Sequence, residues 1–207
     1  FSNTADQISL PELIESGHLV KPRCFVIDCD IQEELSKVKA TIADFDMEEV
    51  ASIMEKEAIT DRVIEEWKKN AGDRQTVIFC STIEHADHVH HAFIQAGIKA
   101  SIVHSELQDD QRALRLDSFD KGELQVMINV AVLTEGWDCQ TVACIVLLRP
   151  CSYKSTMIQM IGRGLRKVDP DHYPGVIKDD CVVLDFGYSL LSHGTIEVNA
   201  PKLTPEE

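Results

Sequence analysis

Two arginines near residue 165 are the side chains in this sequence that are best suited to chemistry. Residues 159–166 read QMIGRGLR and close a stretch, residues 153–165, whose apolar spacing predicts a helix. On a helix, Arg163 and Arg166 would project from one face, because they lie three residues apart. A guanidinium is always charged and binds phosphate oxygens bidentately, so the pair could act as arginine fingers on a γ-phosphoryl group. The alternative is an ordinary helix end whose arginines form salt bridges.

Two glycines, Gly162 and Gly164, surround the first of these arginines. Each glycine weakens a helix but also keeps its flank thin. We therefore expect a nucleotide or another protein surface to approach this helix closely.

The rest of the chain supplies the elements that must position these side chains. From residue 76 onward, short β-rich apolar runs alternate with helical patterns, which is typical of βαβ units on a parallel sheet. The expected strands are residues 76–80, 100–103, 125–129, 143–148 and 181–186, and the expected helices are residues 83–96, 109–121 and 153–165. Gly72, Gly97 and Gly122 follow helical patterns where a left-handed C-terminal cap is needed. The predicted fold class is therefore α/β, with a parallel sheet flanked by helices.

The segments outside this block have weaker patterns. Residues 10–17 predict a short helix and residues 24–28 a further strand. Residues 47–71 predict a long amphipathic helix, broken near residues 59–61, with Thr60 or Asp61 as the N-cap of its second piece. After Phe186 the periodicity is lost, so we expect a loop or a transition into another segment.

The composition indicates a globular protein with an acidic surface. Acidic residues outnumber basic ones by 35 to 20, which gives a formal net charge of -15. Phosphate neutralisation drives most nucleic-acid affinity, so any nucleic-acid contact must be local or shared with a more basic domain. No apolar run has the length of a membrane helix. The first residue is Phe rather than Met, and we expect the chain to be part of a longer polypeptide.

Cysteine and histidine residues suggest no metal site. The seven cysteines form no C-x-x-C pair, and several lie in apolar runs, so we expect reduced core thiols in a cytoplasmic protein. Four histidines crowd the expected helix at residues 83–96, and His88 and His91 would share a face. Without carboxylate or cysteine partners at fixed spacing, a solvated helix face is the preferred interpretation.

Ser81 and Thr82 come directly after the expected strand at residues 76–80. In a parallel α/β sheet, ligands bind beyond the carboxyl ends of the strands, and free N–H groups at a helix start favour a phosphate. The alternative is that these hydroxyls form a plain N-cap.

A third segment, residues 129–138, follows another expected strand and ends in LTEGWD. Its glycine would let a ligand approach the backbone, and Asp138 could accept hydrogen bonds from ribose hydroxyls. The alternative is a turn, with Asp138 as a local cap and Trp137 in the core. We expect all three segments to end at the carboxyl edge of the sheet.

Together these segments resemble the second RecA-like motor domain of superfamily 2 helicases and translocases. The strand with Ser81 and Thr82 is similar to motif IV, residues 129–138 to motif V, and residues 159–166 to motif VI. The resemblance covers roughly residues 10–186, and the three segments in this order are far more specific than each alone. Within the superfamily the sequence looks closest to bacterial DNA-repair helicases of the RadD/YejH type, and restriction-enzyme motor subunits are also near.

The resemblance implies roles at a nucleotide. Arg166 would be the principal arginine finger and Arg163 its partner on the γ-phosphate, with Gln159 orienting the pair. The residues implied to lie against the nucleotide are Glu135, Gly136 and Asp138, with Asp138 facing the ribose.

The resemblance also implies contacts with the nucleic-acid backbone. The residues implied to make them are Ser81, Thr82, His104 and Thr134. Many relatives begin motif V with Thr, where this chain has Asn129. The implied phosphate contact of that motif therefore lacks its usual side chain.

The sequence lacks the other half of such a motor. It contains no G-x-x-x-x-G-K-[ST] loop and no D-E-x-[DH] run. The resemblance therefore implies that a preceding RecA-like domain in the same polypeptide binds ATP and holds most of the Mg²⁺ coordination. We expect residues 1–22 to be a linker from that domain, residues 23–190 the RecA-like domain, and residues 191–207 a tail or transition.

We therefore predict the C-terminal motor domain of an ATP-dependent superfamily 2 helicase or translocase that acts on DNA, in a repair context. Alone, these 207 residues are expected to be inactive. The alternatives are the motor of a restriction-enzyme translocase, an RNA helicase, or a non-catalytic nucleotide-binding module.

Overall fold

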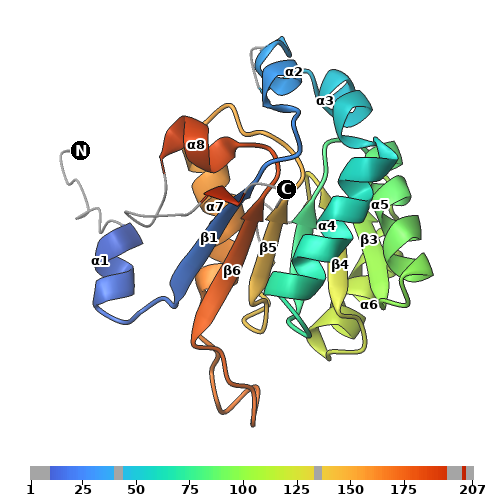
Figure 1. Cartoon of the computed structure of the whole chain (residues 1–207). Helices are drawn as coiled ribbons and strands as arrows, with labels where there is room; N and C mark the ends of the chain where they lie inside the picture. Colours follow the sequence, from blue (N-terminus) through green and yellow to red (C-terminus); the bar gives the residue numbers. More distant parts are fainter. Residues whose placement is uncertain (1–9, 40–43, 133–136, 195–201, 204–207) are drawn as a thin grey trace, which may run out of the picture.

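The computed structural model describes residues 10–39, 44–132, 137–194 and 202–203. Its centre is a sheet in which every pair of neighbouring strands is parallel, in the order β3-β4-β2-β5-β6-β1-β7 (Figure 1). The strands are β1 (Lys21–Ile27), β2 (Thr76–Phe79), β3 (Ala100–His104), β4 (Val126–Val130), β5 (Cys144–Leu147), β6 (Asp180–Asp185) and β7 (Lys202–Leu203). This confirms the predicted α/β class and its parallel sheet.

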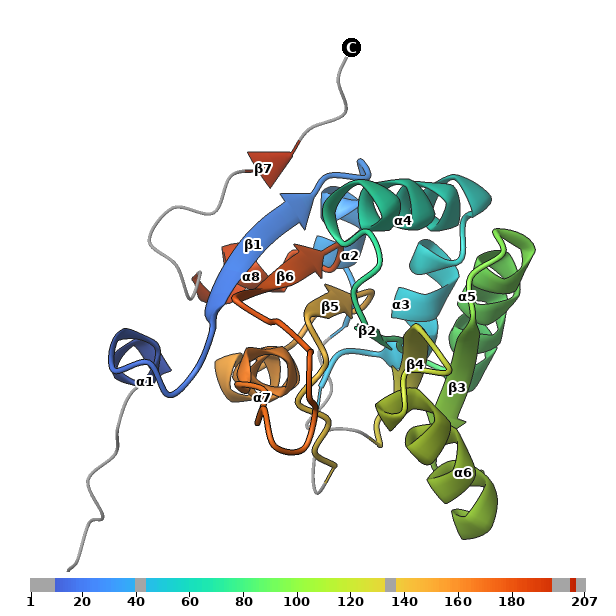
Figure 2. The same ribbon diagram turned by 90° about the horizontal axis from the view of Figure 1, so that it is seen from below.

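Helices cover both faces of the sheet. The helices are α1 (Leu10–Glu15), α2 (Gln32–Ser36), α3 (Met47–Met54), α4 (Glu57–Asn70), α5 (Ile83–Gln95), α6 (Asp109–Asp120), α7 (Lys154–Leu165) and α8 (Ser189–His193). Helices α4 and α5 lie on one face, and α6 and α7 on the other (Figures 1 and 2). Because both faces are covered, the central strands β2 and β5 are buried along their whole length.

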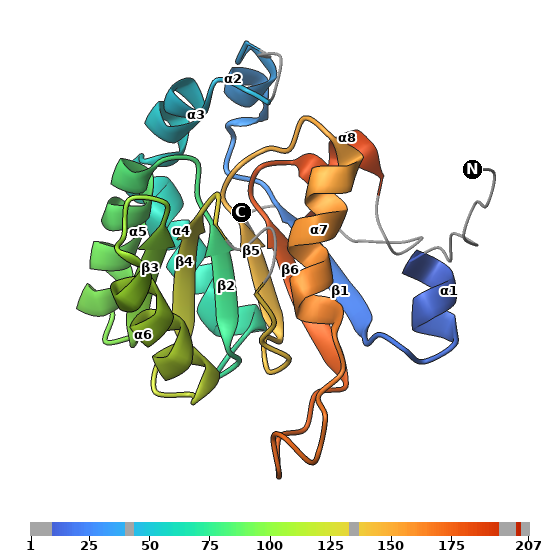
Figure 3. The ribbon, with the colours of Figure 1, turned by 180° about the vertical axis from the view of Figure 1, so that it is seen from behind.

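Helix α7 crosses one face of the sheet from the carboxyl end to the amino end of the strands. It starts shortly after β5, packs against β5 and β6, and is followed by the return to the start of β6 (Figure 3). At its far end the Val20 N–H donates to the Leu165 carbonyl at 2.8 Å, just before β1 begins. The end of α7 is thereby fixed beside the amino ends of β1 and β6.

The five strands and three helices expected from residue 76 onward are all present, within a few residues of their predicted ends. Gly72, Gly97 and Gly122 have φ values of 62°, 78° and 74°, as the predicted left-handed caps require. The short helix and the first strand are also confirmed as α1 and β1, although β1 begins three residues earlier than expected.

The predicted break of the long N-terminal helix is wrong in position. Helix α3 ends at Met54 and α4 begins at Glu57, with Lys56 as an N-cap whose side chain makes no capping bond. Thr60 lies inside α4, where it is buried and pairs with His88 of α5 at 3.1 Å. The Thr60 hydroxyl is thus used in a contact between helices, and this contact overrides its preference for an N-cap.

Three short elements, α2, α8 and β7, had no recognisable pattern. Helix α8 depends on buried Asp185 at the end of β6, whose carboxylate accepts from the N–H groups of Gly187 at 3.0 Å and Leu190 at 2.7 Å. Strand β7 pairs with β1 in the region expected to be a loop. Helix α8 and strand β7 are thus set by contacts with the sheet rather than by their own periodicity.

Candidate functional site

The first arginine of the pair reaches from α7 to the segment before β5. Arg163 lies in the last turn of α7 and is partly buried. Its Nη1 donates to the backbone carbonyl of Trp137 at 2.5 Å. The Trp137 ring packs partly buried against Phe119 of α6, with ring centroids 5.9 Å apart. This ring anchors the segment that receives the arginine.

The second arginine reaches the next residue of the same segment. Arg166 forms an ion pair with Asp138, and their side chains are 37% and 55% exposed. Arg166 is the C-cap of α7, with an extended backbone at φ -63° and ψ 140°. The two guanidinium groups therefore converge on residues 137–138, but the prediction that both project from one helical face is wrong, since the helix ends at Leu165. The salt-bridge alternative is correct for Arg166 in this arrangement.

Lys178 joins the backbone at the end of α7 to the backbone of the segment before β5. Its Nζ donates to the carbonyl oxygens of Arg166 at 2.6 Å and Gln140 at 2.8 Å. Burial lowers the pKa of Lys178 to about 8. The side chain of Gln140 in turn accepts from the Asp169 N–H at 2.7 Å. The segment before β5, the end of α7 and the loop before β6 are thus tied together.

Gln159 lies one turn before Arg163 on the same face of α7, and it is exposed. The two glycines differ. A Cβ at Gly162 would meet nothing within 4 Å, whereas one at Gly164 would lie 2.8 Å from Ile145 Cγ1 and closer still to Cys181 Sγ. The expected thin flank is therefore confirmed at Gly162, but Gly164 is needed for packing α7 on its own sheet.

A second group of predicted residues lies at the carboxyl edge of the sheet. Thr82 is the N-cap of α5 and accepts from the His85 N–H at 3.1 Å, which confirms the capping alternative. Ser81 is 7% exposed, and its hydroxyl has no hydrogen-bond partner among the described residues. His104 ends β3, and its Nδ1 is also buried without a partner in the described part of the chain.

The turn after β4 is held by Asn129. This fully buried side chain accepts from the Val132 N–H at 3.1 Å, across Ala131, which has a φ of +57°. Residues 133–136, which include Thr134, Glu135 and Gly136, lie outside the described residues.

The predicted site is divided between the two ends of the strands. Ser81, Thr82 and His104 follow the carboxyl ends of β2 and β3, whereas Arg163 and Arg166 lie near the amino ends of β1 and β6. The expectation that all three segments end at the carboxyl edge is therefore wrong. Helix α7 runs antiparallel to the strands, so the arginines near its C-terminus are carried to the opposite edge.

The histidines form no metal site in the described residues, where no group of three or more His, Cys, Asp or Glu side chains could hold a metal ion. His88 and His91 are exposed, as a solvated face requires, but His85 is fully buried. Burial lowers the pKa of His85 to about 4, and its Nδ1 lies 3.4 Å from the Ser81 N–H.

The cysteines are free thiols, and six of the seven are buried. Burial raises the pKa of Cys139 and Cys151 to about 11 and that of Cys181 to about 12. The prediction of core thiols is confirmed. No described helix is long and apolar enough to cross a membrane.

The sequence profile described as "Helicase conserved C-terminal domain" matches residues 55–168, which include β2 to β5, α7 and both arginines. The chain belongs to this helicase family. It is 33% identical to ATP-dependent helicase IRC3 of Saccharomyces cerevisiae over 159 residues, which are 75% of this chain and 22% of that protein. It is 32% identical to the mitochondrial ATP-dependent helicase irc3 of Schizosaccharomyces pombe over 181 residues, 86% of this chain and 28% of that one.

The helicase domain also has the fold predicted for it. A fragment structure of an HsdR subunit of a type I restriction enzyme from Vibrio vulnificus YJ016 superposes with a TM-score of 0.67 at 22% identity, over 93% of this chain and 37% of that one. This likeness confirms the RecA-like fold, and the profile match with the two curated relatives confirms the helicase superfamily. Closeness to the RadD/YejH type stays a prediction. The chain spans about a quarter of the length of the two curated relatives.

The sequence did not predict the structural roles of three residues around the candidate site. Lys178 lies in a loop and has no local motif. His85 was grouped with solvated histidines, although its position next to Val89 on an apolar helix face indicates burial. Asn129 was noted as a departure from the family, and its turn-stabilising bond follows from the preference of Asn for side-chain bonds two or three residues onward.

Proposed function

We propose that this domain is the second motor domain of an ATP-dependent DNA helicase or translocase, in which Arg163 and Arg166 act on the γ-phosphate. The supporting observation is the convergence of both guanidinium groups on residues 137–138, at one end of α7. Gln159, on the face of α7 that carries Arg163, would orient the pair. Asp138 would bind the ribose when the nucleotide is present, with Glu135 and Gly136 nearby.

The ion pair between Arg166 and Asp138 suits a guanidinium that must change partners. A pair this exposed is worth about 0–1 kcal/mol, so breaking it costs little. An arginine finger on a transferring phosphoryl group lowers the barrier by roughly 4–7 kcal/mol, which is about 10³- to 10⁵-fold in rate. Exchange of Asp138 for a phosphate is therefore favourable during turnover.

The carboxyl edge would hold the nucleic acid. Ser81 carries a buried hydroxyl and His104 a buried ring nitrogen without partners in the described residues, and such groups cost free energy unless a ligand pairs with them. Thr82 would add backbone N–H groups at the start of α5, and Thr134 a further hydroxyl. With a net charge of -15, the domain would need a more basic partner domain for tight binding.

The missing functions would come from a preceding RecA-like domain in the same polypeptide, which would bind ATP and hold Mg²⁺. Residues 1–22, 23–190 and 191–207 would be linker, motor domain and tail. DNA as substrate and a repair role rest on the sequence resemblance, since the names of the two relatives specify neither DNA nor RNA. A cytoplasmic location is part of the proposal, although one relative is named mitochondrial.

The test is ATP turnover by the full-length polypeptide, with single-stranded DNA, branched DNA or RNA. Arg166→Ala should lower kcat by about 10³-fold or more and leave nucleic-acid affinity within about twofold. Arg23→Ala is the matched control, because Arg23 is 52% exposed and its ion pair is with Asp180 rather than with a predicted site residue. Unchanged turnover in Arg163→Ala and Arg166→Ala would refute the finger assignment, and stimulation by RNA alone would refute DNA.

A further inference from the structure

Lys178 is the one described side chain that bonds to the backbone of Arg166 and of the segment facing it. Its Nζ bridges two carbonyl oxygens, of Arg166 at 2.6 Å and of Gln140 at 2.8 Å. Resting on the proposed function, we propose that Lys178 is a positioning residue, which fixes Arg166 relative to Asp138 and so sets the geometry of the arginine pair during ATP hydrolysis.

The end of α7 needs such a donor. The α7 helix stops at Leu165, whose carbonyl accepts from Val20, and Arg166 continues in an extended conformation. The Arg166 carbonyl therefore points away from the helical bonding pattern. A lysine at a helix C-terminus satisfies free carbonyl groups and complements the helix dipole, and its charge strengthens each bond.

The contacts of Lys178 can fix the position of Arg166 relative to the facing segment. Arg163 bonds to the Trp137 carbonyl, Arg166 pairs with Asp138, and Lys178 bonds to both Arg166 and Gln140. Without Lys178, Arg166 would keep its β-bridge to Leu19, but among the described residues its only link to the segment that it faces would be the exposed pair with Asp138, which is weak. A displacement of about 1 Å at a catalytic group can lower a rate by about 10²-fold.

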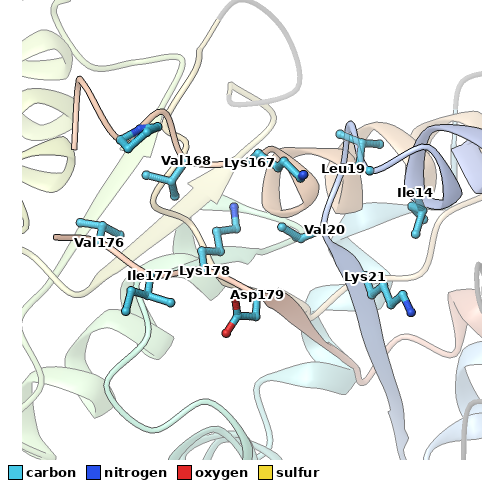
Figure 4. Close-up of a pocket in the computed structure, with 12 residues that line it drawn as sticks. Ile14, Leu19, Val20, Lys21, Lys167, Val168, Val176, Ile177, Lys178 and Asp179 are labelled. Carbon is cyan, nitrogen blue, oxygen red and sulfur yellow. The ribbon is translucent and has the colours of Figure 1, made fainter. Parts of the chain in front are cut away.

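Lys178 differs from the other lysines around it. It lines a pocket of roughly 560 Å³ together with Lys21 and Lys167, and Figure 4 shows it extending from the start of β6 toward the segment that carries Val168. Lys21 and Lys167 are exposed, and no hydrogen bond of their side chains is found among the described residues. Burial lowers the pKa of Lys178, so holding a charged amine at this position costs free energy. The two bonds of its Nζ to carbonyl oxygens offset that cost. The ionisable groups around it are Lys21, Asp138, Cys139, Arg166, Lys167, Asp179 and Cys181.

The experiment measures kcat and KM for ATP in the full-length polypeptide, alone and in an Arg166→Ala background. Lys178→Met removes the donor and keeps the length of the side chain, Lys178→Arg keeps a cationic donor, and Lys21→Met is the control in the same pocket. Lys178→Met should lower kcat by about 10²-fold and change KM by less than about twofold. Lys178→Arg should restore at least a third of the activity, and Lys21→Met should have no effect.

The double variant separates positioning from general damage. If Lys178 acts through Arg166, Lys178→Met should lower kcat by less than about twofold once Arg166 is already Ala. An equal fall in both backgrounds, or no fall in the wild-type background, would overturn the proposal. Arg166→Ala alone reports on the proposed function, so a large loss there with a normal Lys178→Met enzyme would refute only this inference. A single cooperative thermal transition and an unchanged circular dichroism spectrum of Lys178→Met confirm that the fold is intact, and nucleic-acid affinity should not change.

Discussion

The two glycines of α7 offer a sharp test of how the helix is held on the sheet. They lie two residues apart in the same helix, and neither has a positive φ. Gly162 has open space where a Cβ would project, whereas a Cβ at Gly164 would lie 2.8 Å from Ile145 Cγ1 on β5 and would also clash with Cys181 Sγ on β6. Alanine should therefore have opposite effects at the two sites.

The magnitude follows from two contributions. Replacing Gly by Ala inside a helix stabilises a protein by about 0.5–1 kcal/mol, and this applies at both positions. At Gly164 the new methyl must displace Ile145 and Cys181, which are fully buried on neighbouring strands, and overpacking of this kind costs about 1–3 kcal/mol or more. Gly162→Ala should thus raise the free energy of unfolding by about 0.5–1 kcal/mol, and Gly164→Ala should lower it by about 1–2 kcal/mol.

The assay is urea and thermal unfolding of the 207-residue chain, followed by circular dichroism. For a protein of this size, 1 kcal/mol corresponds to roughly 2–4 °C, so the two midpoints should differ by about 3–12 °C. Gly164→Cys or larger residues should follow the same direction. If Gly164→Ala is as stable as Gly162→Ala, then α7 does not pack on β5 and β6 as the structure shows, and the placement of Arg163 and Arg166 fails with it.

Two further predictions concern single buried groups. Ser81→Ala should leave the free energy of unfolding unchanged or raise it slightly, because it removes a hydroxyl without a partner in the described residues. The same change should weaken single-stranded DNA binding by the full-length polypeptide about 3- to 10-fold, measured by fluorescence anisotropy. Lys178 has a folded pKa of about 8, below its ordinary value of 10.5, so the folded state binds fewer protons than the unfolded state between these values. Wild type should therefore gain stability relative to Lys178→Met as pH rises from 8 to 10.5, in urea unfolding at pH 7.5 and 9.5; a constant difference would contradict the burial of the charged amine.

The part of the fold that was predicted well is the part with local causes. Each apolar run and each left-handed glycine cap is visible within about a dozen consecutive residues, and these local patterns predict β2 to β6 with α5, α6 and α7. The break between α3 and α4 was misplaced because the Thr60 hydroxyl pairs with His88, 28 residues away. Helix α8 was missed because its first turn is held by Asp185, whose carboxylate accepts from an N–H five residues onward from the end of a strand.

The candidate site shows the same division. The types of the motif residues were visible in the sequence, and the structure places Arg163, Arg166 and Asp138 together. Their location was not visible, because the rule that ligands bind beyond carboxyl ends applies to residues following strands, whereas the arginines lie near the end of a helix that runs back across the sheet. Lys178 could not be found at all, since its two partners are separated from it by 12 and 38 residues and share no spacing.

In the proposed motor, this division of the site would give α7 a mechanical role. Its first residues lie near the carboxyl edge that carries Ser81 and Thr82, and its last turn carries Arg163. Twelve helical residues span about 18 Å, so a movement at the carboxyl edge, the proposed nucleic-acid contact, would reach the arginines only if the helix stays rigid on β5 and β6. Gly164 makes the close contact with those strands, and Lys178 holds the end of the segment. Loosening either contact should therefore lower ATP turnover by the full-length polypeptide while its affinity for nucleic acid stays unchanged.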